Sequence, residues 1–380
     1  MSFDFDTVVE RRGTDSQKWS RYGDRDVIPM WVADMDFRAS EPVIEALHRR
    51  VDHGVFGYAG PPAELKDVTV ARMAQMYGWT IDPSWIVWLP GLVPALNVVC
   101  RAFGDEGDDI LTFTPAYPPF LAAPSLSHRT LKTVPLVRQD GRFTFDIERL
   151  EREISPRSRV LLLCSPYNPA GRRFDPDELR QVAELCLERN IVLCSDEIHC
   201  DLILDGHEHT PTASLSPEIA SNTITLMAPS KTFNVPGLNC AFAIIPNDEL
   251  RHRFKRAREG IVPFPNALGY AACLAAYHNG EPWRTALIEY LRVNKDLVRR
   301  VINDEIPGLA MDDVQATYLA WIDTRALNLF NPMRFFEEAG VGLSNGKDFQ
   351  GPGYVRLNFG CPRQTLSEGL DRIKSAIAKL

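Results

Sequence analysis

The sequence lacks the features that mark membrane-spanning, secreted and nucleic-acid-binding chains. No apolar run approaches the roughly 20 residues that a helix needs to cross a bilayer. Residues 1–13, MSFDFDTVVERRG, are charged and contain no apolar stretch of the kind found in secretion signals. The net charge of −8 disfavours nucleic acid or an anionic membrane as a partner. We therefore expect no nucleic-acid or membrane partner and a cytoplasmic location.

Paired cysteines are also missing. The chain has eight cysteines, but no two of them form a CxxC pair, and most lie in apolar stretches. This pattern predicts buried free thiols in a reducing cytosol rather than a disulfide framework or a metal site. The cysteines are Cys100, Cys164, Cys186, Cys194, Cys200, Cys240, Cys273 and Cys361.

Short apolar runs alternate with helical patterns through the middle of the chain. Residues 175–190, DPDELRQVAELCLERN, predict an amphipathic helix that opens at Pro176. Strands that alternate with helices predict a largely parallel sheet with both faces covered. In such sheets, ligands bind at the carboxyl ends of the strands. The predicted strands lie within residues 158–166, 191–202, 222–230 and 240–246.

The C-terminal part reads differently, as an α+β module. Residues 318–327 and 353–360 predict strands, whereas residues 332–341 and 363–380 predict helices. We place a domain boundary inside the long helical stretch near residues 280–295. The predicted division is an N-terminal segment (1–45) that contributes to the small domain and the active-site entrance, a large domain (46–285) and a small α+β domain (286–380).

Lys231 stands alone in a tight segment, MAPSKTFNVPGLN. It is the only charged residue between Glu218 and Asp248. Most lysines lie in solvated loops, and Lys231 alone fits that interpretation. The alternative is an amine kept neutral by burial, which can form a Schiff base.

Three further polar residues follow predicted strands. Asp196 ends a buried strand and needs a partner, either an arginine, backbone N–H groups or a heterocyclic nitrogen cation; Glu197 beside it should point the other way. His199 is either a satisfied structural histidine or a donor to a phenolate oxygen. Asn168, in SPYNPAG, either shapes a turn or donates to an anionic ring oxygen.

Taken together, these motifs resemble a known family. SPYNPAGR, SDEIHCDL and APSKTFNVPGL are similar to the cofactor motifs of the class I/II aminotransferase superfamily, the fold-type I enzymes that use pyridoxal 5'-phosphate (PLP). KWSRYG, PMWVADMDF, HGVFGYAG, GEPW, ATYLAWID and RLNFGCPR resemble its cystathionine β-lyase branch, the MalY/PatB-type C–S lyases. The resemblance runs from about residue 3 to 375 and implies the aspartate aminotransferase-like α/β fold: a large domain with a mixed, mostly parallel sheet between helices, and a smaller α+β domain.

The resemblance implies a role for each motif residue at the cofactor. Lys231 would form a Schiff base with PLP. Asp196 would pair with the protonated pyridine nitrogen, which makes the ring an electron sink. Asn168 and His199 would bind the ring 3-oxygen, and Tyr117 would stack on the ring face.

It also implies a phosphate site and a shared dimer. The cofactor phosphate would lie on the backbone N–H groups of Leu92 and Val93, where a helix begins, with the Ser230 hydroxyl beside it. Tyr58, in GYAG, would reach the phosphate or substrate of the neighbouring subunit. A homodimer with shared active sites is therefore part of the prediction.

The amino-acid substrate would be held by its α-carboxylate. The resemblance implies that Arg356, in YVRLNFG, binds this carboxylate bidentately, while Asn168 and the backbone around Ala33 complete the grip. Tyr167, Phe264 and the entrance segment 259–266 are expected to shape the pocket for the thiol half of the substrate. Met30, Trp31 and Met35 are expected in the core or at the entrance.

Two positions depart from the pattern of many aminotransferases in the superfamily. Asn239 stands eight residues after Lys231, where many relatives carry a phosphate-binding arginine, and Ala228 stands three before it, where a serine is common. We therefore expect fewer positive charges around the cofactor phosphate than in those relatives. The missing arginine also favours a lyase over a transaminase.

The expected activity is α,β-elimination from an L-cysteine S-conjugate, such as a cystathionine-like thioether, to a thiol, pyruvate and ammonia. Lys231 would act as the base at Cα, and Lys231 or Tyr58 would supply the proton to the leaving thiolate. An aminotransferase on the same fold stays open, as does an enzyme that decarboxylates or deaminates an S-conjugate. A regulatory module that binds PLP without catalysis is a further alternative, but the motifs start within the first residues and leave no room for an N-terminal DNA-binding domain.

Overall fold

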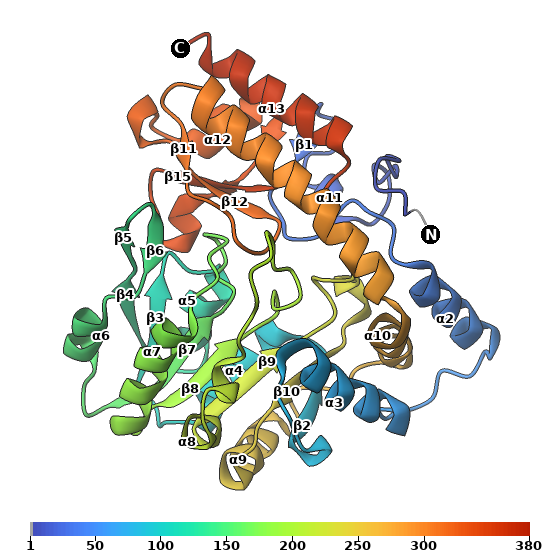
Figure 1. The fold of residues 1–380 in the computed structure, drawn as a ribbon, viewed down its shortest axis with the longest axis vertical. Coiled ribbons are helices and arrows are strands. Elements are labelled where there is room, and N and C mark those ends of the chain that lie inside the picture. The colour runs from blue at the N-terminus through green and yellow to red at the C-terminus, as the bar shows by residue number, and fades with distance from the viewer. Residues whose placement is uncertain (1–2) are drawn as a thin grey trace.

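A computed structural model describes residues 3–380. Its centre is a seven-stranded sheet in the order β2-β10-β9-β8-β7-β3-β4, in which only β10 runs antiparallel to its neighbours (Figure 1). The predicted mostly parallel sheet is confirmed. The strands are β2 (Ile86–Leu89), β3 (Asp109–Thr114), β4 (Thr130–Pro135), β7 (Ser158–Cys164), β8 (Val192–Asp196), β9 (Thr223–Met227) and β10 (Ala241–Ile244).

Helices cover this sheet. Side chains of β10 alternate between two buried clusters: Ala241 and Ala243 belong to one, and Phe242 and Ile244 belong to the other. Alternation of this kind is expected for a strand whose two faces are both buried. The helices of this part of the chain are α2 (Glu41–Asp52), α3 (Ala63–Tyr77), α4 (Leu92–Ala102), α5 (Pro118–Leu126), α6 (Ile147–Glu153), α7 (Pro176–Glu188), α8 (Pro217–Ser221), α9 (Asp248–Arg258) and α10 (Ala267–Asn279).

The helix predicted over 175–190 is α7. Asp175 and Glu178 form a capping box at its start, and Pro176 is its first residue. Leu179 and Val182 are among the side chains that it buries in the core. This helix therefore begins where the sequence signals place it.

The C-terminal part is an α+β module around an antiparallel sheet of order β11-β12-β15-β14. This module occupies the top of Figure 1. The two predicted strands and two predicted helices of this region are confirmed. The elements are α11 (Glu281–Arg300), β11 (Ala310–Met311), β12 (Leu319–Asp323), α12 (Pro332–Glu338), β13 (Val341–Gly342), β14 (Ser344–Asn345), β15 (Tyr354–Asn358) and α13 (Arg363–Ile377).

The N-terminal segment joins this module. It contains α1 (Gln17–Ser20) and β1 (Ile28–Pro29), and β1 pairs in parallel with β13. α11 runs unbroken across the predicted boundary at residue 285, so the division into 1–45, 46–285 and 286–380 stays a prediction. A separate hairpin is formed by β5 (Val137–Gln139) and β6 (Arg142–Thr144).

All eight cysteines are buried free thiols, as predicted. Met30 and Met35 lie in the core, also as predicted. Within residues 3–380, no helix combines the length and apolar character that crossing a bilayer would require.

Candidate active site

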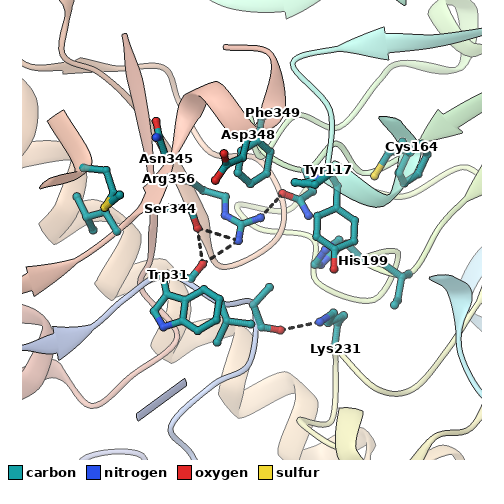
Figure 2. Close-up of a pocket in the computed structure, with 18 of the residues that line it drawn as sticks. Trp31, Tyr117, Cys164, His199, Lys231, Ser344, Asn345, Asp348, Phe349 and Arg356 are labelled. Carbon is teal, nitrogen blue, oxygen red and sulfur yellow. Dashed lines mark hydrogen bonds between the residues drawn. The ribbon is translucent and has the colours of Figure 1, made fainter. Parts of the chain in front are cut away.

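Three polar residues predicted at strand ends line one cavity. Asp196 is the last residue of β8, Asn168 follows β7, and Lys231 follows β9. Because β7, β8 and β9 are parallel neighbours, their carboxyl ends meet at the same edge of the sheet. The cavity has a volume of about 330 Å³ and is also lined by His199, Tyr117, Ala33 and Arg356. Figure 2 shows several of these side chains turned toward one another.

The amine of Lys231 is largely withdrawn from solvent. Its Nζ donates a hydrogen bond to the Ala33 carbonyl oxygen at 2.6 Å. Burial lowers the pKa of Lys231 from its ordinary value of 10.5 to about 8, although the nearby Asp34 carboxylate opposes the change. At pH 7 the amine is still mostly protonated, but its neutral, nucleophilic fraction is far larger than that of an ordinary lysine.

Asp196 is buried with little compensation. Its Oδ1 accepts one hydrogen bond, from the backbone N–H of Ile198 at 3.1 Å, and within residues 3–380 it forms no ion pair. Burial raises the pKa of this carboxyl to about 7. A cationic ring nitrogen would supply the missing positive charge.

Glu197 points away from the cavity, as predicted. Its carboxylate accepts hydrogen bonds from the Ser195 hydroxyl at 2.8 Å and the Thr212 backbone N–H at 3.0 Å, and it contacts His209 Nε2 at 2.7 Å. The two adjacent carboxylates therefore point in different directions. Glu197 is bound by Ser195, His209 and Thr212, and of the two only Asp196 lines the cavity.

His199 and Tyr117 contribute neutral side chains. His199 is buried, and its Nδ1 has no hydrogen-bond partner among the described residues. Burial, together with the positive charges of Lys231 and Arg356, holds the pKa of His199 well below its usual value. Tyr117 precedes α5, and burial raises the pKa of its phenol. Both side chains are thus neutral donors or acceptors at neutral pH.

Arg356 is a buried cation without a carboxylate partner in residues 3–380. It lies in β15, and its guanidinium donates to Asn168 Oδ1 and the Trp31 carbonyl, both at 2.8 Å, and to Ser344 Oγ at 3.3 Å (Figure 2). Its Nε has no partner. Burial lowers the pKa of Arg356 to about 10, so it stays charged at neutral pH. Phe349 packs 4.8 Å from the guanidinium carbon.

Residues 31–33 line the cavity, and side chains from other parts of the chain hold the backbone carbonyls of residues 31–35. Asn358 Nδ2 donates to the carbonyls of residues 32 and 34 at 2.7 Å each. The Tyr318 hydroxyl donates to Ala33 at 2.9 Å, and Asn234 Nδ2 donates to Met35 at 2.9 Å. Side chains from the loop after β9 and from the C-terminal module thus hold this strip of backbone.

Charged side chains that do not line the cavity also bind the segment of residues 31–36. Lys18 Nζ donates to the Asp34 carbonyl at 3.1 Å and pairs with Asp36 at 2.7 Å, although both side chains are buried. Arg11 contacts the carboxylates of Asp34 and Asp36 at 2.9 and 2.6 Å. Sequence reasoning missed Asn358, Tyr318 and Lys18, because nothing local in KWSRYG or RLNFG signals such long-range contacts.

Four predicted site residues lie outside the lining of this cavity. Leu92 and Val93 open α4, and Ser230 is half-buried next to Lys231. Tyr58 lies on the connection between α2 and α3 with its side chain fully exposed, so this chain does not use it at its own cavity. The roles assigned to these four residues stay predictions.

Two expectations about the pocket differ from the structure. Tyr167 is packed in the hydrophobic core, and Phe264, within residues 259–266, is exposed. Neither lines the cavity of the described chain: Tyr167 is turned into the core by the loop after β7, and Phe264 lies against the Arg258 guanidinium instead. Trp31 does line it, as expected for an entrance residue.

Comparison with known proteins gives a consistent result. Residues 25–373 match the family model for aminotransferase class I and II. Cystathionine beta-lyase PatB of Bacillus subtilis (strain 168) is 40% identical over 386 residues, which cover 98% of this chain and 100% of PatB. The crystal structure of OvoB has a TM-score of 0.97 and 44% identity, with complete coverage of both chains. Cystalysin from Treponema denticola, whose crystal structure contains a PLP cofactor, has a TM-score of 0.96 and 34% identity over the whole of both chains.

The chain therefore belongs to the aminotransferase class I and II family, the fold-type I PLP-dependent enzymes. Within it, the chain is a carbon–sulfur β-lyase of the cystathionine β-lyase type, and its cofactor is PLP. The residues of the cavity fit that cofactor: a poorly compensated buried carboxylate, an unpartnered imidazole nitrogen and an amine withdrawn from water converge there.

Proposed function

We propose that the enzyme cleaves L-cysteine S-conjugates, of the cystathionine-like thioether class, by α,β-elimination to a thiol, pyruvate and ammonia. One observation carries the proposal. The cavity that holds the Lys231 amine also holds Arg356, a buried cation with no carboxylate partner in the described chain. An α-amino acid supplies the matching carboxylate and places its Cα near the amine.

Arg356 binds and orients the substrate. Its guanidinium offers a planar fork of donors, which suits bidentate contact with the α-carboxylate. The Asn168 side-chain oxygen and the Trp31 carbonyl each accept a hydrogen bond from the guanidinium. These contacts fix the plane of the guanidinium before the substrate binds. This contact sets the direction of the Cα–H bond.

Lys231 moves the proton. When bound at this site, PLP withdraws electrons from the substrate Cα and so acidifies its C–H bond. Because the pKa of Lys231 is lowered by burial, its free amine takes the Cα proton near neutral pH. The Cβ–S bond then breaks, and the thiolate receives a proton from Lys231 or from the Tyr58 that a second subunit contributes. The three-carbon fragment takes up water and yields pyruvate and ammonia.

Asp196, Asn168, His199 and Tyr117 hold the cofactor in this proposal. Asp196 would pair with the pyridine nitrogen, Asn168 and His199 would bind the 3-oxygen, and Tyr117 would pack against the ring. The phosphate is assigned to the backbone N–H groups that open α4, at Leu92 and Val93, with Ser230 nearby.

We further propose a homodimer in which Tyr58 serves the partner's site. Support comes from the extended connection between α2 and α3, which exposes Val55, Phe56 and Tyr58. Exposed apolar side chains that are close in sequence are typical of an interface. The buried free thiols agree with a cytoplasmic location.

The test is incubation with L-cystathionine in the absence of any keto acid, followed by assay of pyruvate and free thiol. We expect both products in equal amounts. Product formation that requires a keto-acid acceptor would indicate an aminotransferase instead, and loss of CO₂ or ammonia without thiol would indicate the decarboxylating or deaminating alternative. Lys231→Ala should lose turnover together with the visible absorbance of the bound cofactor, and retained turnover would contradict the role of this lysine.

A further inference from the structure

The Lys231 amine rests on a backbone oxygen that a second side chain also holds. Lys231 Nζ donates to the Ala33 carbonyl at 2.6 Å, and the Tyr318 hydroxyl donates to the same oxygen at 2.9 Å. Figure 2 draws the first of these bonds as a dashed line. Tyr318 is 1% exposed and does not itself line the cavity, so its hydroxyl acts on the site through Ala33.

Ala33 lies at the centre of a tight turn, and its carbonyl has different partners from those of its neighbours. The Asp34 backbone N–H donates to the Val32 carbonyl at 3.0 Å, across Ala33. The Asn358 side chain binds the carbonyls of Val32 and Asp34, but not that of Ala33. Within residues 3–380, the Ala33 carbonyl is therefore held by two donors alone, which are Lys231 and Tyr318.

The segment that carries Tyr318 is tied to the loops that follow two strands of the large sheet. The Ala316 N–H donates to the Gly171 carbonyl at 3.0 Å, in the loop after β7. The Thr317 N–H donates to the Leu202 carbonyl at 2.8 Å, in the loop after β8. Tyr318 is thus fixed relative to the strand ends that supply the polar residues of the cavity.

Thr317, immediately before Tyr318, has a strained backbone. Its φ of +73° lies in the left-handed region, which a β-branched residue rarely adopts. Thr317 is fully buried, and its hydroxyl accepts a hydrogen bond from the Leu319 N–H at 3.1 Å. Strain of this kind persists only where the surrounding structure enforces it, and it is concentrated at functional sites. Here it sets the direction of the Tyr318 side chain at the start of β12.

The Tyr318 ring is packed independently of its hydroxyl. It meets the His199 ring edge-on, with 6.1 Å between the ring centroids. It also lies so close to Gly360 that a Cβ added there would be 3.3 Å from Tyr318 Cγ. Because these contacts hold the ring, replacing Tyr318 by phenylalanine should remove the hydroxyl and leave the ring in place.

The orientation of the Ala33 carbonyl matters for the chemistry of Lys231. A neutral amine has two N–H groups and one lone pair, and one N–H is bound by Ala33. The direction of this bond therefore restricts where the lone pair points. We propose that Tyr318 is a positioning residue for Lys231: its hydroxyl fixes the Ala33 carbonyl, and this aims the free amine at the Cα proton of the substrate. This inference rests on the proposed function, in which Lys231 takes that proton.

The shared oxygen also affects the charge of Lys231. An oxygen that accepts two hydrogen bonds binds each donor less strongly than an oxygen that accepts one. Removing the Tyr318 hydroxyl should therefore strengthen the bond from the protonated amine to Ala33 and raise the pKa of Lys231. A phenylalanine at this position leaves the other groups that face the amine unchanged; these are the charged Asp34, Asp196 and Arg356 and the neutral His199 and Tyr117.

The experiment compares the wild type with Tyr318→Phe, and Tyr270→Phe is the matched control. Tyr270 is buried, its hydroxyl has no partner in the described chain, and it does not line the cavity. Each protein is first stripped of PLP and treated with cyanate, which carbamoylates neutral amines. Mass spectrometry follows the modification of Lys231 as a function of pH. The PLP-loaded enzymes then give kcat and KM for pyruvate release from L-cystathionine, and the isotope effect on kcat with α-deuterated substrate.

In the stripped protein, Tyr318→Phe should raise the pH of half-maximal carbamoylation of Lys231 from about 8 by about half a unit. In the loaded enzyme it should lower kcat about tenfold and leave KM within about twofold, because the contacts of Arg356 are kept. The isotope effect should exceed that of the wild type, since removal of the Cα proton then limits the rate more strongly. Tyr270→Phe should match the wild type in every measurement.

A carbamoylation profile of Tyr318→Phe that matches the control would overturn the inference. An unchanged isotope effect would overturn it as well, because either result would leave Tyr318 with a packing role only. If the wild type releases no pyruvate from L-cystathionine, the proposed function fails. The carbamoylation profile needs no substrate, so it still decides whether Tyr318 acts on Lys231, and the two failures are distinguished.

Discussion

The withdrawn amine of Lys231 should destabilise the cofactor-free protein. Below pH 8 the amine is protonated in both the folded and the unfolded chain. The free-energy cost of burying the charged amine in the folded chain is therefore fully present at these pH values. The pKa falls from 10.5 to about 8 on folding, and one pKa unit corresponds to about 1.4 kcal/mol, which makes this cost about 3 kcal/mol. Replacing Lys231 by methionine should remove it.

The stability that Lys231→Met gains over the wild type should depend on pH, and this dependence tests the lowered pKa of Lys231. Between pH 8 and 10.5 the unfolded chain binds more protons at Lys231 than the folded chain, so the stability of the wild type rises with pH there. The advantage of Lys231→Met should thus shrink from about 3 kcal/mol at pH 7 to about 1 kcal/mol at pH 9.5. Loss of the hydrogen bond to Ala33 subtracts about 1 kcal/mol at both pH values.

Urea unfolding of the PLP-stripped wild type and variant, at pH values from 7 to 9.5, measures the effect. Lys255→Met is the matched control, because it removes an exposed lysine of α9. A stability difference between Lys231→Met and the wild type that stays constant over this range would refute the reasoning, since it would mean that Lys231 titrates near its ordinary pKa.

Three other outcomes follow from the site. Asp196→Asn should retain PLP but lose kcat by about a hundredfold or more, because an amide cannot hold a positive charge on the ring nitrogen; a near-normal kcat would contradict this pairing. Lys18→Met should lower the free energy of unfolding by about 3 kcal/mol in urea titrations, because Asp36 loses a buried partner; a loss below about 1 kcal/mol would show that Arg11 suffices. Mixing inactive Lys231→Ala and Tyr58→Phe subunits should restore activity at about a quarter of the sites, whereas unshared sites would give none.

The cofactor side of the site could be predicted from the sequence, since its geometry is local. Asn168, Asp196 and Lys231 each follow a strand, and parallel strands bring their carboxyl ends together whatever the rest of the chain does. Helix α7 was equally predictable, because Asp175 and Pro176 mark its start.

The substrate side could not be predicted in the same way. Arg356 and Asn358 donate hydrogen bonds to backbone carbonyls within residues 31–34. The pairing of β1 with β13 brings this N-terminal segment next to the C-terminal module. No periodicity or capping signal encodes contacts at such separation. Only the resemblance of RLNFG to a family motif pointed to Arg356.

The contact between Arg356 and the Trp31 carbonyl joins residues 325 apart in the chain. During synthesis, the ribosome adds about 5–20 residues per second, so tens of seconds separate the emergence of these two partners. All strands of the large sheet leave the ribosome before β15 does, so the α-carboxylate site is the last part of the active site to be synthesised. Residues of β15 also belong to the hydrophobic core that covers one face of the large sheet, so the part of the chain that completes the substrate site also completes that core.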